Sequence, residues 1–255
     1  MKIKTAIIFS VALSILTFSL VTFQQQGSLD DGDSPTDVEL GKRNEREKKY
    51  SKHLRKNFDP SKSIPAGISE AKRLGKRSDL VLIVESELNL EFLSFDQDRF
   101  LQLLVCTSDA VVFGTVKSKV AHLTADESWV YTEYGIQVED IVKNNLQKPI
   151  QQHSTIYFGR TGGKIKAEGY VVNVENSSFK QLKKNGSYVL FLKYLPDVDA
   201  YFSVNPFADF LLSGKKFEAV STPSVTTKLN KYLSYPYLIN TLKSTLNSCK
   251  SVDQS

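Results

Sequence analysis

Short apolar stretches separated by polar turns recur over residues 105–222, a pattern typical of a β-sheet protein. Residues 110–116 are apolar on both faces, which predicts a central strand, and Gly114 inside this strand predicts a bend or bulge. A turn is predicted at residues 125–128. Apolar and polar residues alternate over residues 129–139, which predicts a long strand with one solvated face.

The same kind of pattern continues towards the C-terminus. Turns containing Gly or Asn, such as Asn185-Gly186, separate the apolar stretches. Residues 159–164, GRTGGK, are rich in Gly but lack the spacing of a phosphate-binding loop, so they are interpreted as a hairpin turn. Further strands are predicted at residues 155–158, 170–174, 187–195, 201–204, 209–212 and 217–220. This series predicts a mainly β domain over residues 105–222, a closed antiparallel OB-like barrel.

The predicted barrel is flanked by helical patterns on both sides. Tyr50, Leu54 and Phe58 recur every four residues, which predicts a short amphipathic helix within a polar and basic linker over residues 24–79. The basic residues of this helix could contact an anionic lipid or polymer, but the Glu residues among them favour a solvated helix face.

Two further segments adjoin the barrel. Residues 80–104 are interpreted as a lead-in with a buried strand at residues 80–84, followed by an irregular segment. In the C-terminal segment, residues 223–255, Leu238, Leu242 and Leu246 step by four and predict a helix with Pro236 in its first turn.

The N-terminus has the character of an export signal. Lys2 and Lys4 precede an uncharged apolar run over residues 5–23. The run suits either a cleaved signal peptide or an uncleaved signal-anchor, because it approaches the length of a membrane span and lacks a clear cleavage site. Both alternatives for residues 1–23 predict an exported chain that is periplasmic, secreted or anchored, with membrane contact only through this segment.

Composition and charge narrow the classes of partner. Apolar residues make up 41% of the chain and charged residues 24%, as in globular proteins. The net charge is +5, and without Lys2 and Lys4 the balance is 31 basic to 28 acidic residues, or +3. This small excess does not indicate nucleic-acid binding.

Few residues suggest chemistry. Cys106 and Cys249 predict either a disulfide bond, as expected in an exported chain, or two buried thiols. No catalytic, cofactor-binding or metal-ligating residues are assigned, because neither the cysteines nor the three histidines have companions at suitable spacing. Arg160, in the predicted turn, is a candidate surface contact. Trp129 and Tyr131 form either an exposed aromatic patch or ordinary packing against a loop.

The barrel region contains the motifs SDAVVFGTV at residues 108–116, VYTEY at 130–134, VEDIVKN at 138–144, RTGG at 160–163 and YVLFL at 188–192. These motifs resemble those of a group of uncharacterised exported bacterial proteins. The similarity covers about residues 105–215 and implies a barrel domain but no particular activity. A weaker resemblance, to netrin-like barrels of the metalloproteinase-inhibitor type, implies the same fold; those barrels are rich in disulfides, whereas this chain has two cysteines.

Taken together, these features favour an exported or envelope-associated binding module without enzymatic activity. Its partner is unknown, and an envelope protein or polymer suits the predicted location. The alternative is a hydrolase-like enzyme whose site is assembled from loops.

Overall fold

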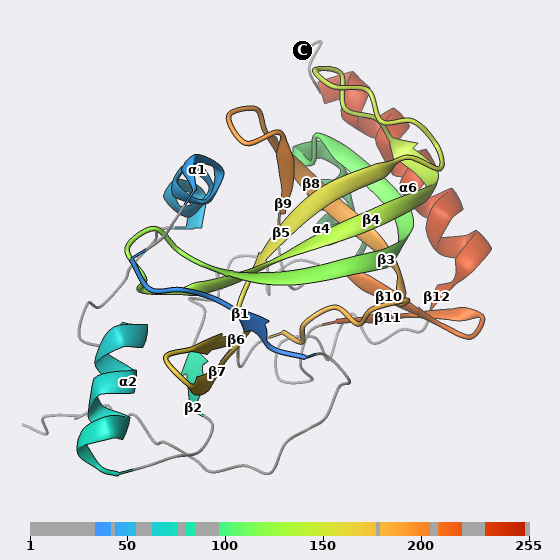
Figure 1. Cartoon of the computed structure of the whole chain (residues 1–255). Coiled ribbons are helices and arrows are strands. Elements are labelled where there is room, and N and C mark those ends of the chain that lie inside the picture. The colour runs from blue at the N-terminus through green and yellow to red at the C-terminus, as the bar shows by residue number, and fades with distance from the viewer. Residues whose placement is uncertain are drawn as a thin grey trace, which may run out of the picture.

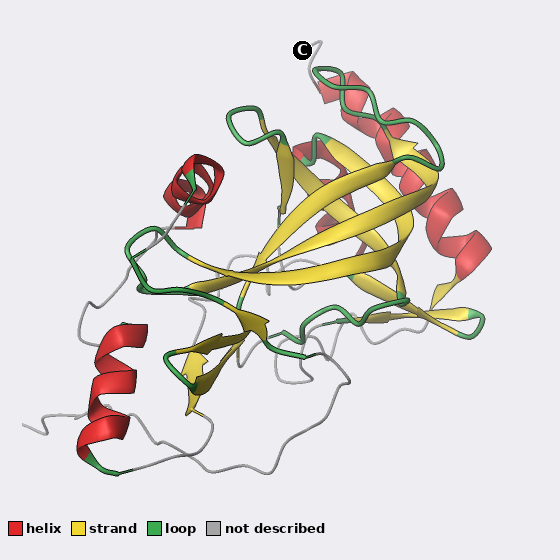
Figure 2. Ribbon diagram, viewed as in Figure 1, coloured by secondary structure: helices red, strands yellow, loops and turns green. Residues whose placement is uncertain are grey.

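The computed structural model describes residues 34–41, 44–54, 63–75, 80–84, 97–176, 179–204, 209–220 and 233–252. The chain is mainly β, as predicted, and its strands form one sheet of eight and one sheet of four, with helices around them (Figure 1 and Figure 2). The predicted export signal at residues 1–23 lies outside the described residues. Within the described residues, no helix has the length and apolar character needed to cross a membrane.

The helices and the strands are given separately, each in chain order. The helices are α1 (Glu45–Leu54), α2 (Ile64–Arg73), α4 (Gln97–Thr107) and α6 (Tyr235–Val252). The strands are β1 (Thr36–Asp37), β2 (Leu80–Val84), β3 (Ala110–Leu123), β4 (Val130–Lys143), β5 (Thr155–Thr161), β6 (Gly163–Ala167), β7 (Tyr170–Asn176), β8 (Ser187–Leu195), β9 (Ala200–Ser203), β10 (Phe210–Ser213), β11 (Lys216–Ala219) and β12 (Leu233–Ser234).

The large sheet has the strand order β12-β11-β10-β8-β3-β4-β5-β9, and β9 also pairs with β8. All of its pairings are antiparallel except that of β5 with β9, which is parallel. The long hairpin of β3 and β4 shifts register between Phe113 and Gly114, which confirms the predicted irregularity. A Cβ atom at Gly114 would lie 2.6 Å from the carbonyl oxygen of Gln137, so the close strand contact requires glycine.

The interior of the large sheet is apolar. Residues of β3, β4, β5 and β8 alternate so that one set points inward, as a strand with period two requires. This set forms a buried cluster that includes Val112, Val116, Tyr134, Ile136, Val138, Phe158, Leu190 and Leu192.

The small sheet has the order β1-β6-β7-β2, and α2 packs against it through Ile64 and Ile68. The chain passes from β5 of the large sheet to β6 of this sheet at Gly162 and Gly163, whose φ angles of 88° and 145° are accessible mainly to glycine. The hairpin turn predicted at residues 159–164 is therefore wrong. Strand β5 continues to Thr161, β6 begins at Gly163, and the glycines instead carry the chain from one sheet to the other.

Helices α4 and α6 cover one outer face of the large sheet. Leu101 and Leu104 of α4 and Leu238 and Leu242 of α6 share a buried cluster with apolar residues of β3 and β8. The predicted disulfide between Cys106 and Cys249 is present and links these two helices, with the Cα atoms 5.5 Å apart. The predicted C-terminal helix is confirmed as α6, whereas the irregular segment expected before Cys106 ends in helix α4.

Candidate functional site

Helix α1 lies against the large sheet on the side away from α6, beside the β3–β4 turn and β9 (Figure 1). The sequence starts this helix with a capping box. The Glu47 backbone N–H donates to the Asn44 Oδ1 atom at 2.8 Å, and the Asn44 N–H donates to the Glu47 carboxylate at 2.8 Å. A helix of ten residues is marginal in isolation, so its position depends on the surface that it covers.

A stack of three rings forms the centre of the contact. Tyr50 of α1 is 1% exposed and lies parallel to Tyr131 of β4, with ring centroids 4.8 Å apart and an interplanar angle of 6°. Tyr131 in turn stacks on His122 of β3 at 5.1 Å. The Tyr50 hydroxyl donates to the carbonyl oxygen of Tyr201 at 2.9 Å, so the one polar atom of this buried side chain has a partner.

Gly159 of β5 makes room for this ring. A Cβ atom at position 159 would lie 1.6 Å from the Tyr50 Oη atom and 2.3 Å from its Cζ atom. The Tyr50 ring therefore rests directly on the backbone of β5, and any side chain at position 159 would displace it.

An ion pair flanks the ring stack. Arg46, one helical turn before Tyr50, has its guanidinium 2.5 Å from the carboxylate of Glu133 on β4. Its Nε atom donates to the carbonyl oxygen of Val198 at 3.4 Å, and its Cζ atom lies 5.8 Å from the centre of the Tyr157 ring. The hydrogen bond to Glu133 raises the pKa of Arg46, which stabilises the charged form of an already basic group.

Three further polar contacts close the two ends of α1. His122 Nδ1 lies 3.1 Å from the Glu47 carboxylate, and His53 Nε2 lies 2.9 Å from the Asp197 carboxylate. The backbone N–H of Ala125, in the β3–β4 turn, donates to the Ser51 hydroxyl at 2.8 Å. The contact thus extends from the β3–β4 turn to the β8–β9 turn.

We call the surface beneath α1 the α1-binding face. It consists of the outer side chains at His122, Tyr131 and Glu133, the exposed backbone at Gly159, and the turns at residues 124–129 and 196–199.

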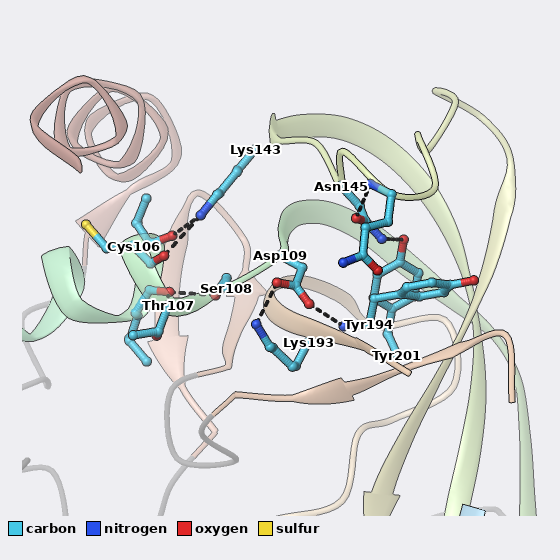
Figure 3. A network of polar contacts seen from close by, with 12 residues as sticks. Cys106, Thr107, Ser108, Asp109, Lys143, Asn145, Lys193, Tyr194 and Tyr201 are labelled. Atoms are coloured by element: carbon cyan, nitrogen blue, oxygen red, sulfur yellow. Dashed lines mark hydrogen bonds and ion pairs between the residues drawn. The ribbon is translucent and has the colours of Figure 1, made fainter. Parts of the chain in front are cut away.

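A separate set of polar contacts lies at the β8–β9 turn, and Figure 3 shows the one between Asn145 and Tyr201. Asn145 donates to the Tyr201 hydroxyl at 3.1 Å, and the Tyr194 hydroxyl donates to Asp199 at 2.8 Å. Lys148 also contacts Asp199 through both carboxylate oxygens. Because Asp197 and Val198 lie in this turn, these contacts help to position the groups that meet α1.

Figure 3 also shows how the adjoining end of the sheet is held. Asp109 lies between the Lys193 ammonium group, at 2.7 Å, and the backbone N–H of Tyr194, at 2.8 Å. Lys143 donates to the carbonyl oxygens of Val105 and Cys106 at 2.9 Å and 3.2 Å. These contacts join the end of α4, the start of β3 and the ends of β4 and β8 into one rigid unit.

Charge is complementary across the contact. Helix α1 has four Lys or Arg residues and two Glu residues, a net charge of +2 with His neutral. The α1-binding face presents the carboxylates of Glu133 and Asp197 to it. A basic helix is therefore bound on an acidic surface.

The forces that hold α1 are modest. Burial of a large ring such as Tyr50 contributes roughly 1.5–3 kcal/mol, and its hydrogen bond contributes about 1 kcal/mol. The half-exposed pair of Arg46 and Glu133 contributes about 0.2–1 kcal/mol. Ordering of the helix backbone opposes these contributions, so the net free energy of docking is on the order of a few kcal/mol.

The prediction of Arg160 as a surface contact is wrong. Arg160 lies in β5, not in a turn, and is 1% exposed. One of its guanidinium nitrogens lies 3.1 Å from the Asp209 carboxylate, and its Cζ atom lies 4.3 Å from the centre of the Phe179 ring. Arg160 and Asp209 are thus a buried ion pair.

Both members of this pair bear the cost of burial. Burial lowers the pKa of Arg160 and raises the pKa of Asp209 to about 7, although the charge of Arg160 opposes the latter shift. Asp209 is 0% exposed, so the pair contributes to the interior of the protein and offers nothing to a ligand at the surface.

Of the two alternatives for Trp129 and Tyr131, the exposed aromatic patch is wrong and packing against neighbouring residues is correct. Tyr131 is 3% exposed because Tyr50 and His122 cover its two faces. Trp129 is half-buried against the cluster between the two sheets. Tyr131 is nevertheless central to the α1-binding face, in a buried role that the sequence did not indicate.

Several residues of the α1-binding face had no assigned role at the sequence level. The sequence assigns no role to His122 or to His53 of α1, and it predicts a solvated face for the strand that contains Glu133. The Asn44 and Glu47 capping box and the spacing of Arg46 and Tyr50 by one helical turn were the available signals. Among the described residues, no group of three His, Cys, Asp or Glu side chains is arranged to hold a metal ion.

Comparison of the sequence with models of known protein families and with curated proteins finds no match.

Proposed function

We propose that this protein is an exported binding module, without enzymatic activity, that recognises a basic segment of another protein on the α1-binding face. One observation carries the proposal: this face already binds a helix through the stack of Tyr50 on Tyr131, a buried hydroxyl hydrogen bond and an ion pair with Glu133. Aromatic and Arg side chains are the groups that most often dominate binding energy at interfaces.

The pairing of the strands supports a closed OB-like barrel as the fold of this module. Strands β3, β4, β5, β9 and β8 each pair with two others of the set, in a ring. In OB barrels, ligands bind to the face of the second and third strands and to the loops after the first and fourth strands. Here those places correspond to β4, β5 and the turns at residues 124–129 and 196–199. They coincide with the α1-binding face.

The charge of the face favours a basic protein segment over nucleic acid. Glu133 and Asp197 would repel phosphate groups, whereas they pair with Arg46 and His53 of α1. The disulfide between Cys106 and Cys249 supports an oxidising compartment and hence export. The resemblance to exported bacterial proteins agrees with this location. No observation on the described residues favours the alternative of a loop-assembled hydrolase site.

The test uses α1 itself as the probe. A peptide of residues 44–54 is made with a staple between positions 48 and 52, which are both exposed and one helical turn apart. The staple reduces the entropic cost of forming so short a helix. Binding is measured to the full-length Tyr50→Ala variant, in which the ring that anchors the resident helix is absent.

Saturable binding of this peptide to Tyr50→Ala supports the proposal, and Glu133→Gln added to that variant is expected to weaken binding by up to about fivefold, which corresponds to the loss of about 1 kcal/mol from an ion pair. The matched control is Tyr237→Ala added instead, because Tyr237 is 59% exposed and lies on α6. A peptide with the same residues in scrambled order should not bind. Equal binding of the scrambled peptide, or no binding of the native one, would overturn the proposal.

A further inference from the structure

We infer that α1 is an intramolecular competitor that keeps the α1-binding face closed, and that the partner displaces it with a basic helix carrying an Arg and an aromatic residue one turn apart. The inference rests on the proposed function, because it concerns the regulation and the ligand of the same face.

Docked α1 excludes any other ligand from this face. The Tyr50 ring covers Tyr131 and leaves no space above Gly159, and the Arg46 guanidinium occupies Glu133. A partner can reach these groups only after α1 has left. Binding by the partner and docking of α1 are therefore mutually exclusive.

Helix α1 is held more weakly than the other parts of the fold that surround it. Among its described side chains, only Tyr50 and Ser51 are buried, and its remaining contacts are polar and partly exposed. Helix α6 provides the contrast within the same protein, because it buries Leu238, Ile239 and Leu242 and is joined to α4 by the disulfide. An element held by a few weak contacts opens locally while the rest of the fold stays intact.

The contacts of α1 also define the chemistry of the partner. The face accepts a flat ring with a hydroxyl group that reaches the carbonyl oxygen of Tyr201, and a guanidinium four residues earlier that reaches Glu133. Asp197 adds a preference for a basic group near the end of the helix. The ligand is therefore a helical protein segment with the pattern Arg-x-x-x-Tyr and a net positive charge, which binds through one face of the helix.

The experiment measures opening of α1 in the wild-type chain and needs no variant. Hydrogen exchange is followed by NMR on the ¹⁵N-labelled full-length protein, with and without the unlabelled stapled peptide of residues 44–54. An open state populated at about 0.1–10% gives α1 amides protection factors on the order of 10–1,000, well below those of β3 and β4. Addition of the peptide should accelerate exchange in α1 and leave α6 unchanged.

A second measurement compares peptide affinities. Wild-type protein should bind the stapled peptide about 10- to 1,000-fold more weakly than Tyr50→Ala. This factor should equal the reciprocal of the open population of α1 measured by exchange. Lys49→Ala, which alters an exposed residue of α1, should bind as wild type does. Gly159→Ala should release α1 but fail to bind the peptide, because its added Cβ atom occupies the place of the ring.

The two proposals fail in different ways. No binding to Tyr50→Ala overturns the proposed function and the inference together. If the peptide binds Tyr50→Ala but the α1 amides of wild type are protected as strongly as those of β3 and β4, only the inference is overturned. The same conclusion follows if wild type and Tyr50→Ala bind the peptide equally well, because α1 would then not compete for the face.

Discussion

Removal of one member of the buried ion pair should cost far more stability than removal of both. Arg160→Met would leave the Asp209 carboxylate buried without its countercharge, since both side chains are at most 1% exposed. Breaking a buried pair in this way typically costs about 3–5 kcal/mol, and the lost contact with Phe179 adds to the effect. The double variant Arg160→Met with Asp209→Leu removes both charges, and its unfolding free energy should lie within about 1 kcal/mol of wild type or above it.

The pH dependence of the same pair has a definite sign. The pKa of Asp209 is raised to about 7 in the folded state, against about 3.9 for an ordinary Asp. Between these values the folded protein binds the extra proton, so the contribution of Asp209 to stability is complete below pH 4 and is lost as the pH rises to 7. At about 1.36 kcal/mol per pKa unit, the change over this window is on the order of 4 kcal/mol.

The assay is urea denaturation of wild type, both single variants and the double variant at pH 5, 6, 7 and 8. Asp209→Asn should abolish the loss of stability with rising pH in this window. The destabilisation by Arg160→Met should shrink at pH 5, because Asp209 is then neutral. At pH 8, where Asp209 is charged, single variants that cost less than about 1 kcal/mol, or a double variant whose cost is the sum of the two single costs, would refute the reasoning that an uncompensated buried charge dominates.

Three further predictions concern stability. Replacement of Cys106 and Cys249 by Ser should lower the unfolding free energy by up to about 5 kcal/mol, which is the chain-entropy value for a disulfide that closes a separation of 143 residues. An unchanged midpoint of urea denaturation would contradict this. Asn44→Ala should remove the helix cap and accelerate exchange of α1 amides by about fivefold, from a loss of about 1 kcal/mol, with no change in the global melting temperature. Gly114→Ala should cost about 1–3 kcal/mol in thermal unfolding because its Cβ atom would meet the carbonyl of Gln137, and a neutral effect would show that the strands can separate there.

The parts of the fold that the sequence predicted well have strong local patterns. The apolar run at residues 187–195 coincides with β8, because its short length, its aromatic residues and the Asn185-Gly186 turn before it favour a strand over a helix. The helix around Leu238 and Leu242 follows from their spacing by four. For Cys106 and Cys249 the sequence left a disulfide and two buried thiols as alternatives, and only the structure places the two residues within bonding distance.

The errors arise where the outcome depends on distant parts of the chain. Arg160 follows a glycine and precedes two more nearby, so a turn was expected, but pairing with β4 extends the strand through it. Its burial depends on Asp209, far along the chain, which no local pattern reveals. Helix α1 was predicted from the position of Tyr50, but amphipathic spacing shows only which face is apolar and not where that face docks.

The central claim is that the α1-binding face recognises a basic helix, and an NMR titration of the ¹⁵N-labelled Tyr50→Ala variant tests it most directly. We predict that the unlabelled stapled peptide of residues 44–54 shifts the backbone amides of Tyr131, Glu133 and Gly159 and of the turns at residues 124–129 and 196–199. Amides of α6 should not move. Saturable shifts confined to other surfaces would contradict the account. So would the absence of shifts at peptide concentrations up to about 1 mM, because a Kd of that size corresponds to a binding free energy of only about −4 kcal/mol.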